Sequence, residues 1–125
     1  MPLMKGIKAS CKDGFQILSG DDGTCLDLCL LGGHGVVSVV SHIIPGPINT
    51  LIQKSMSGDD SSLAEFKKYE LLLKYLYIEP NPVPAKMALF YMGIIKSPSV
   101  RLPLIKMTEA NSNLFKTELE KLDLL

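Results

Sequence analysis

The spacing of apolar and polar residues divides the chain into a strand-rich beginning and a helical remainder. Near the amino terminus, short apolar runs stop at residues that favour turns, such as Asp13-Gly14 and the cluster at 19–23. A later run is rich in β-branched residues and apolar on both faces, which is typical of a strand inside a parallel sheet. We predict three strands, at residues 6–10, 15–18 and 36–44.

Elsewhere apolar residues recur every three or four positions, which is the period of an amphipathic helix. This spacing predicts helices at residues 24–31, 48–56, 63–77 and 85–92. A last helix is expected to start at Thr108-Glu109 and to turn Leu114, Leu119 and Leu122 inward. The prolines within residues 78–84 exclude a helix there and predict an extended connector.

Strands that alternate with helices favour an α/β layer arrangement. The predicted order is strand, strand, helix and strand, followed by four helices. We therefore expect the carboxyl-terminal helices to form a separate block. The loop that follows Gly58 is the expected boundary, which gives a strand-containing region 1–58 and a helical region 59–125.

Composition excludes several classes of function. The chain carries 13 basic and 13 acidic side chains and no block of like charges, so it lacks the field that captures nucleic acid or anionic membranes. Its longest apolar stretch, 36–44, is far below the ~20 residues of a membrane helix. Three cysteines without Cys-x-x-Cys spacing and the lack of a signal-like start argue against a secreted scaffold. We expect a cytoplasmic protein with no nucleic-acid or membrane partner.

Polar side chains follow the predicted strands at the ends where parallel α/β proteins bind ligands. Lys8, Ser19 and Asp21 are among them. Lys8 is the most informative, because a lysine that faces an apolar cavity can lose its proton and form a Schiff base with a ketone. The alternative is an ordinary solvated lysine.

Other polar clusters have simpler structural explanations. Asp21-Asp22 could serve a metal or acid–base chemistry, but aspartates in such a loop more often cap a helix. His34 and His42 lack the compact spacing of zinc ligands. Cys25 and Cys29 suit core packing on a short apolar helix. We therefore expect no metal and no cofactor.

Four segments stand out by their order and spacing: Ser19-Gly20-Asp21-Asp22, Gly32-Gly33-His34-Gly35-Val36-Val37-Ser38-Val39, residues 79–86 and residues 101–104. Together they closely resemble the carboxyl-terminal half of the 4-hydroxy-tetrahydrodipicolinate synthase family, and the match runs from Phe15 to Leu125. The Glu-Pro-Asn-Pro-x-Pro-x-Lys element at 79–86 separates this family from other pyruvate aldolases, such as N-acetylneuraminate lyase.

The resemblance implies a partial (β/α)₈ TIM barrel, comprising about strands 6 to 8, followed by a carboxyl-terminal helical block. It implies a lyase that holds pyruvate as a Schiff base and condenses it with L-aspartate 4-semialdehyde in lysine biosynthesis, usually as a homotetramer. The family carries the imine-forming lysine in a Gly-Ile-Lys-Glu segment of the sixth strand. Gly6-Ile7-Lys8-Ala9 matches that segment except for its alanine, so the resemblance makes Lys8 the candidate catalytic residue.

The resemblance also implies substrate-binding positions. Ser19-Gly20-Asp21 would form the loop after the seventh strand, near the substrate carboxylate. Val37 matches the eighth-strand position whose backbone carbonyl faces the cavity. Asn81 and Lys86 would lie in the helical appendage near the entrance of the site.

The sequence also departs from the family pattern. The first five strands are not matched, nor are the family's paired threonines, its proton-relaying tyrosine and the arginine that binds the aldehyde. Only six residues separate Lys8 from Phe15, too few for the helix that should follow the sixth strand. We expect either a hairpin through Asp13-Gly14 or a loose amino-terminal segment, with Lys8 outside its usual setting.

These departures leave three hypotheses. The first is a truncated synthase, inactive as the isolated chain, whose partners would be further copies or a complementary amino-terminal half. The second is a non-catalytic remnant or an oligomerisation partner of a full-length paralogue. The third is another pyruvate-dependent aldolase, against which the 79–86 element argues. Because a three-strand remnant would expose sheet edges and apolar faces, we expect poor solubility or assembly.

Overall fold

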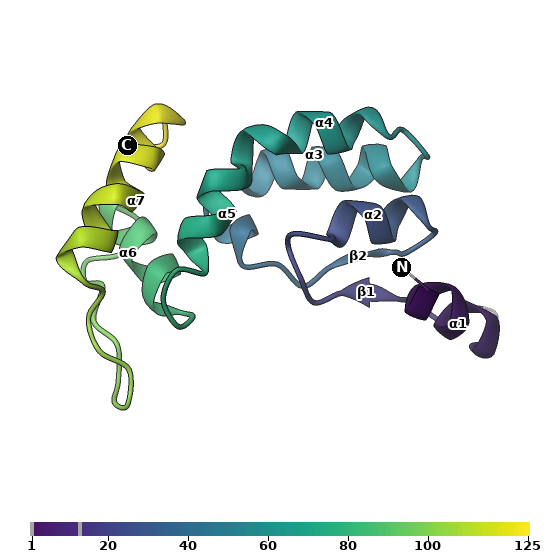
Figure 1. Cartoon of the computed structure of the whole chain (residues 1–125), viewed down its shortest axis with the longest axis horizontal. Coiled ribbons are helices and arrows are strands. Elements are labelled where there is room, and N and C mark those ends of the chain that lie inside the picture. Colours follow the sequence, from purple (N-terminus) through teal and green to yellow (C-terminus); the bar gives the residue numbers. More distant parts are fainter. Residues whose placement is uncertain (1, 13) are drawn as a thin grey trace. The chain divides into compact units, whose positions relative to one another are not determined.

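The computed structural model describes residues 2–12 and 14–125 (Figure 1). The chain separates into two compact units, one ending at Lys67 and one running from Lys68 to Leu125. The first unit contains α1 (Pro2–Ser10), β1 (Leu18–Ser19), α2 (Cys25–Leu30), β2 (Gly35–Val36), the 3-10 helix η1 (Val40–His42), α3 (Pro45–Met56) and α4 (Ser61–Phe66). The second contains α5 (Glu70–Leu76), α6 (Val83–Tyr91) and α7 (Glu109–Lys121), and the 3-10 helix η2 (Lys67–Tyr69) lies at the boundary.

A β–α–β motif forms the centre of the first unit. β1 and β2 pair in parallel, with Leu18 opposite Gly35 and Ser19 opposite Val36. Parallel strands need a crossover connection, and α2 provides it (Figure 1). The helix predicted at 24–31 is confirmed, and its stop at Gly32 follows from a φ of +89°, which favours glycine.

The strand predicted at residues 6–10 is wrong, because this segment belongs to helix α1. Met4, Ile7 and Cys11 recur at intervals of three and four, the period of a helix rather than of a strand. The hairpin expected between this segment and 15–18 is therefore absent from the described residues, and Asp13 of its expected turn lies outside them. A helix precedes β1 where we expected none.

The strand predicted at 36–44 is also wrong over most of its length. Pairing ends at Val36, and the chain turns into η1 at Val40. The cause is a long-range contact, because the Asp22 carboxylate accepts hydrogen bonds from the backbone N–H groups of Val39 and Val40, at 3.0 and 2.9 Å. These bonds stabilise a helical turn in a segment whose composition favours a strand.

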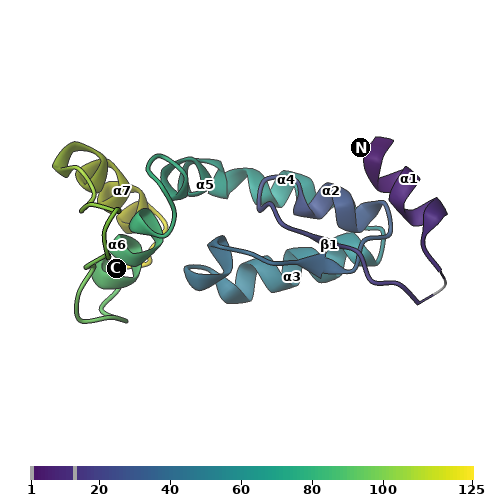
Figure 2. The ribbon, with the colours of Figure 1, turned by 90° about the horizontal axis from the view of Figure 1, so that it is seen from below.

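The core of the first unit lies between α2, α3 and α4, which are shown in Figures 1 and 2. The helix predicted at 48–56 is confirmed as α3, which buries Ile48, Leu51 and Ile52. The Ser55 and Ser62 hydroxyls share a hydrogen bond of 2.7 Å, which joins α3 to α4 without leaving a buried polar group unpaired. α4 packs on α3 and so belongs to the first unit. The first unit therefore ends at Lys67, whereas the boundary was expected after residue 58.

The single helix predicted at 63–77 is divided into α4, η2 and α5. Phe66, Tyr69, Leu72 and Leu76 are buried along it at intervals of three, three and four residues. A 3-10 turn advances three residues per turn, so η2 accommodates the interval between Phe66 and Tyr69. Apolar spacing located the buried residues but did not reveal this change of helix type.

Three helices, α5, α6 and α7, build the core of the second unit. The helix predicted at 85–92 is confirmed as α6, but α6 begins at Val83, inside the segment 78–84 where the prolines were expected to exclude a helix. Pro84 is tolerated there because the first turn of a helix needs no N–H from it. The last predicted helix is confirmed as α7. Phe115 and Leu119 are fully buried, and the Phe115 ring lies 6.1 Å from that of Tyr75 on α5. Leu114 was expected to face inward, but it is 51% exposed because Phe115, its neighbour, occupies the inward position.

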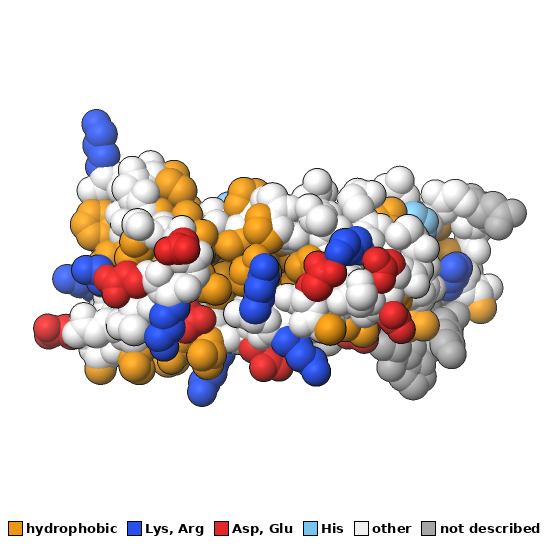
Figure 3. Space-filling model, turned by 90° about the horizontal axis from the view of Figure 1, so that it is seen from above, with side chains coloured by type: hydrophobic (Ala, Val, Ile, Leu, Met, Phe, Trp, Pro, Cys, Tyr) orange, Lys and Arg blue, Asp and Glu red, His pale blue; other side chains and the backbone are white. Residues whose placement is uncertain are grey.

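The segment between α6 and α7 is a long loop without helix or strand (Figure 1). Leu102 and Ile105 are exposed on it, and Met107 is buried where the loop returns to α7. Apolar side chains are open to solvent elsewhere too, and Figure 3 shows several among charged ones on one face. Within the described residues, no helix is both long and apolar enough to cross a lipid bilayer.

Candidate functional site

The carboxyl ends of β1 and β2 bring together the residues expected to bind substrate in the first unit. Ser19 pairs with Val36, and the Val37 N–H donates a hydrogen bond of 2.8 Å to the Ser19 carbonyl. Ser19-Gly20-Asp21 therefore lies beside Val37 at one end of a parallel strand pair. Ligands bind at this end of the sheet in α/β proteins.

A compact turn fixes the Ser19-Gly20-Asp21 loop. The buried Ser19 hydroxyl donates to the Asp21 carbonyl at 2.9 Å and accepts from the Asp21 N–H at 3.1 Å. The Thr24 hydroxyl donates to the Asp21 carboxylate at 2.7 Å. The Ser19 hydroxyl is thus engaged by the backbone, so this loop offers a ligand mainly its backbone groups and the exposed Asp21 carboxylate.

Gly20 leaves room at the loop, because a Cβ built on it would meet no atom within 4 Å. Val37 is also open, with 72% of its surface exposed. A ligand could approach the peptide groups of both residues. The roles of Ser19, Gly20, Asp21 and Val37 in substrate binding remain predictions.

Asp22 has a structural role that the sequence suggested only in general terms. Its side chain is 1% exposed and caps the start of η1 through Val39 and Val40. A carboxylate committed to two backbone donors is poorly suited to acid–base chemistry. Over the described part of the chain, no cluster of three or more histidine, cysteine or acidic side chains could hold a metal ion.

Lys8 does not have the setting that its expected chemistry requires. It lies on the exposed side of α1 rather than at the carboxyl end of a strand facing an apolar cavity. Its Nζ lies near Gly32, close enough that a Cβ built there would collide with it. The geometry therefore gives no support to Lys8 as the imine former, although the role itself remains a prediction.

The two buried cysteines of α2 are packing residues, as expected. Burial, followed by the nearby charge of Asp22, raises the pKa of Cys25 to about 12. Burial also raises the pKa of the Cys29 thiol. Both thiols therefore stay protonated at neutral pH, where nucleophilic or redox chemistry would need the thiolate.

His34 anchors β1, a contact that sequence reasoning missed. The Nδ1 atom of its ring accepts a hydrogen bond of 3.0 Å from the Ile17 backbone N–H. The backbone N–H of His34 donates a hydrogen bond of 2.8 Å to the Ile17 carbonyl. The ring nitrogen thus extends the strand pairing by one residue. The Gly-Gly-His-Gly spacing was visible in the sequence, but only the parallel register of β1 and β2 shows what it does.

Asn81 and Lys86 belong to the second unit, Asn81 just before α6 and Lys86 within it. The Lys86 ammonium donates a hydrogen bond to the Ser99 carbonyl. Their expected place near the site entrance remains a prediction.

The comparisons with known proteins agree on one family. A model described as the Dihydrodipicolinate synthetase family matches residues 1–122. A 4-hydroxy-tetrahydrodipicolinate synthase from Bdellovibrio bacteriovorus is 39% identical over 124 residues, which cover 98% of this chain and 42% of the relative. The enzyme of that name from Alcanivorax borkumensis is 42% identical over 105 residues, covering 83% of this chain and 35% of the relative.

Solved structures give the same result. The dihydrodipicolinate synthase from Aquifex aeolicus superposes with a TM-score of 0.91 at 34% identity, covering 97% of this chain and 41% of that one. The dihydrodipicolinate synthase from Thermotoga maritima superposes with a TM-score of 0.85 at 36% identity, covering 91% of this chain and 39% of that one. These neighbours are TIM-barrel enzymes. The chain spans about two fifths of the length of the relatives it matches.

Proposed function

Because the chain belongs to the dihydrodipicolinate synthetase family, we propose that its first unit supplies the last two strands of a (β/α)₈ barrel, β1 and β2. In that barrel pyruvate, held as a Schiff base, condenses with L-aspartate 4-semialdehyde. The observation that carries the proposal is the parallel β1–α2–β2 motif, which places Ser19-Gly20-Asp21 beside Val37. The family consists of lyases of the class I pyruvate aldolase type.

In this proposal the carboxyl ends of β1 and β2 hold the pyruvate carboxylate. The open space over Gly20 admits the ligand to the backbone N–H groups of the loop. The Val37 carbonyl would face the bound substrate. Thr24 holds the Asp21 carboxylate, which keeps the loop in one conformation as the substrate enters.

The amine that forms the Schiff base must come from elsewhere in the barrel. Lys8 lies on the exposed side of α1, and no lysine directly follows β1 or β2. We therefore propose that α1 is the helix preceding the seventh barrel strand, so that Lys8 is not the imine former.

Borohydride trapping tests this proposal for Lys8. The 125-residue chain is incubated with pyruvate and borohydride, and peptide masses are measured. We expect no adduct at Lys8 above that at Lys12, an exposed lysine two residues beyond α1. A stoichiometric adduct at Lys8, lost in Lys8→Arg, would show that Lys8 is the imine former after all.

Activity is tested by supplying the remaining barrel. The chain is assayed alone and mixed with the amino-terminal part of the Bdellovibrio bacteriovorus relative, and the product is measured by mass spectrometry. We expect product only from the mixture, because the residues at the ends of β1 and β2 include no imine-forming amine. The amino-terminal part alone is the control. Product from the 125-residue chain by itself would contradict the proposal.

A non-catalytic role as an assembly partner is the second candidate. It is favoured by three apolar side chains on or near the strand pair that a partner could cover. Phe15, Leu18 and Val37 are 59%, 50% and 72% exposed to solvent. Co-purification of the chain with a full-length relative, without a change in that relative's turnover, would support this role over the first.

A further inference from the structure

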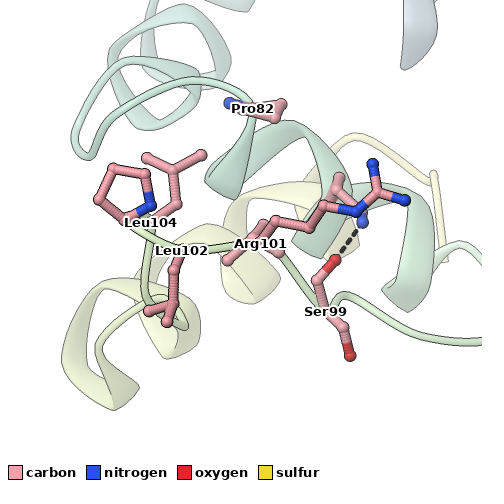
Figure 4. A pocket seen from close by; sticks show the side chains of 8 residues that line it. Pro82, Ser99, Arg101, Leu102 and Leu104 are labelled. Atoms are coloured by element: carbon pink, nitrogen blue, oxygen red, sulfur yellow. Dashed lines mark hydrogen bonds between the residues drawn. The ribbon is translucent and has the colours of Figure 1, made fainter.

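Two sequence motifs that the proposed function leaves unused line one pocket of the second unit. Pro82 and Lys86 come from the 79–86 element at the start of α6. The other lining residues, 99–104, include the Arg-Leu-Pro-Leu motif of the loop that follows α6. The pocket has a volume of about 650 Å³, which lies within the range of small-molecule sites. Figure 4 shows the side chains around it.

The charge of this pocket is entirely positive. Lys86 and Arg101 line it, and no aspartate or glutamate does. The Lys86 ammonium bonds the neutral Ser99 carbonyl (dashed in Figure 4), so its charge is not compensated. Within residues 2–12 and 14–125, the Arg101 guanidinium makes no ion pair and no hydrogen bond.

We propose that this pocket binds a small organic carboxylate. The Arg101 guanidinium presents its donors as a planar fork that matches the two oxygens of a carboxylate, and Lys86 adds a second positive charge. Pro82, Pro103 and Leu104 provide apolar surface for a short hydrocarbon body. Inorganic phosphate has no apolar part to use that surface, so the lining favours a carboxylate.

This site shares no residue with the substrate-binding residues proposed for β1 and β2. All its lining residues belong to the second unit, and none belongs to the β1–β2 loops. Its test therefore measures binding directly and does not depend on turnover.

The chain is suited to such a measurement because Arg101 is its only arginine. The guanidinium Nε–H of the isotope-labelled chain gives one assignable NMR signal. Titration with butyrate is expected to shift this signal and the amides of Val100 and Leu102 until they saturate. Butyramide has the same shape without the charge and is expected to leave them unchanged.

Variants separate this pocket from general surface charge. Arg101→Gln is expected to weaken butyrate binding about tenfold or more, read from the amide shifts of Val100 and Leu102. Lys96→Gln removes an exposed cation that does not line the pocket, and it is expected to leave the affinity unchanged.

Three results would overturn the proposal. One is the absence of a saturable shift at the Arg101 Nε–H in the unmodified chain. Another is an equal loss of affinity in Lys96→Gln and Arg101→Gln. The third is equal binding of inorganic phosphate, which would make the pocket an unselective anion site.

Discussion

At the scale of single residues, Asp22 determines the course of the chain after β2. Its buried carboxylate accepts from the N–H groups of Val39 and Val40 and so starts η1. We expect Asp22→Ala to lower the free energy of unfolding by about 2–4 kcal/mol, because two backbone donors lose a charged acceptor. Denaturant unfolding measures this loss, and hydrogen exchange at the amides of Val39 and Val40 locates it.

Asp60→Ala is the matched control for this prediction. Asp60 is exposed at the start of α4 and makes no side-chain capping bond, so its loss is expected to change stability by less than about 0.5 kcal/mol. If Asp22→Ala were as stable as Asp60→Ala, or if exchange at Val39 and Val40 did not rise, the capping role would be wrong.

Residue-level contacts also explain which parts of the fold the sequence could predict. The stops at Gly32 and Gly93 are local, since a positive φ favours glycine whatever surrounds it, and the helices before them were predicted correctly. The segment at 36–44 was misread because its conformation depends on Asp22, 17 residues away from Val39. Local composition carries no trace of such a bond.

For the candidate site too, features set by local sequence were predicted and features set by distant contacts were not. The end of β1 was predicted to within one residue, because turn residues follow it at 19–23. The end of β2 was predicted eight residues too late, because the chain leaves the strand after Val36 without a local turn signal. Lys8 was assigned to a strand although it lies on helix α1. The assignment relied on a short match to Gly-Ile-Lys and overlooked the helical spacing of Met4, Ile7 and Cys11. Three matching residues specify chemistry only when the element that carries them is the expected one.

At the scale of elements, Glu79 joins the connector before α6 to the start of α7. Its Oε1 accepts from the Thr108 N–H, the Thr108 hydroxyl and the Asn111 amide, at 3.0, 2.8 and 2.8 Å. Burial acts to raise the pKa of Glu79, but these three hydrogen bonds outweigh it and hold the pKa below the usual 4.5. The carboxylate thus satisfies donors in the first turn of α7, which also has a favourable dipole for negative charge.

This arrangement predicts a pH dependence of the second unit. Because the pKa of Glu79 is lower in the folded chain, its stabilisation is fully present above about pH 4.5 and is lost as the pH falls through the folded value. We expect Glu79→Gln to be less stable than the unmodified chain at pH 7 and closer to it at pH 3. Urea unfolding at the two pH values measures the difference.

Glu109→Gln is the control for Glu79, because Glu109 is an exposed carboxylate in the first turn of the same helix. Its variant should keep the pH dependence of the unmodified chain. A stability difference between Glu79→Gln and the unmodified chain that stays constant from pH 7 to pH 3 would rule out the carboxylate as its cause.

At the scale of the whole molecule, we expect the strand pair to be the surface through which the chain associates. Within the described residues each strand has a single neighbour, so both outer edges keep backbone groups available for pairing. Val37 and Leu18 lie exposed beside those edges. We expect the chain to self-associate, with a sedimentation coefficient that rises with concentration.

Two lysine substitutions test whether association uses this edge. Val37→Lys places a charge beside β2 and should shift the chain toward monomer, because a buried unpaired ammonium opposes edge-to-edge pairing. Leu114→Lys changes a leucine that is 51% exposed on α7, in the other unit, and should leave association unchanged. If Leu114→Lys dissociates the assembly and Val37→Lys does not, the contact lies on the helical unit. A cooperatively unfolding monomer at all concentrations would mean that the edges of so short a strand pair do not drive assembly.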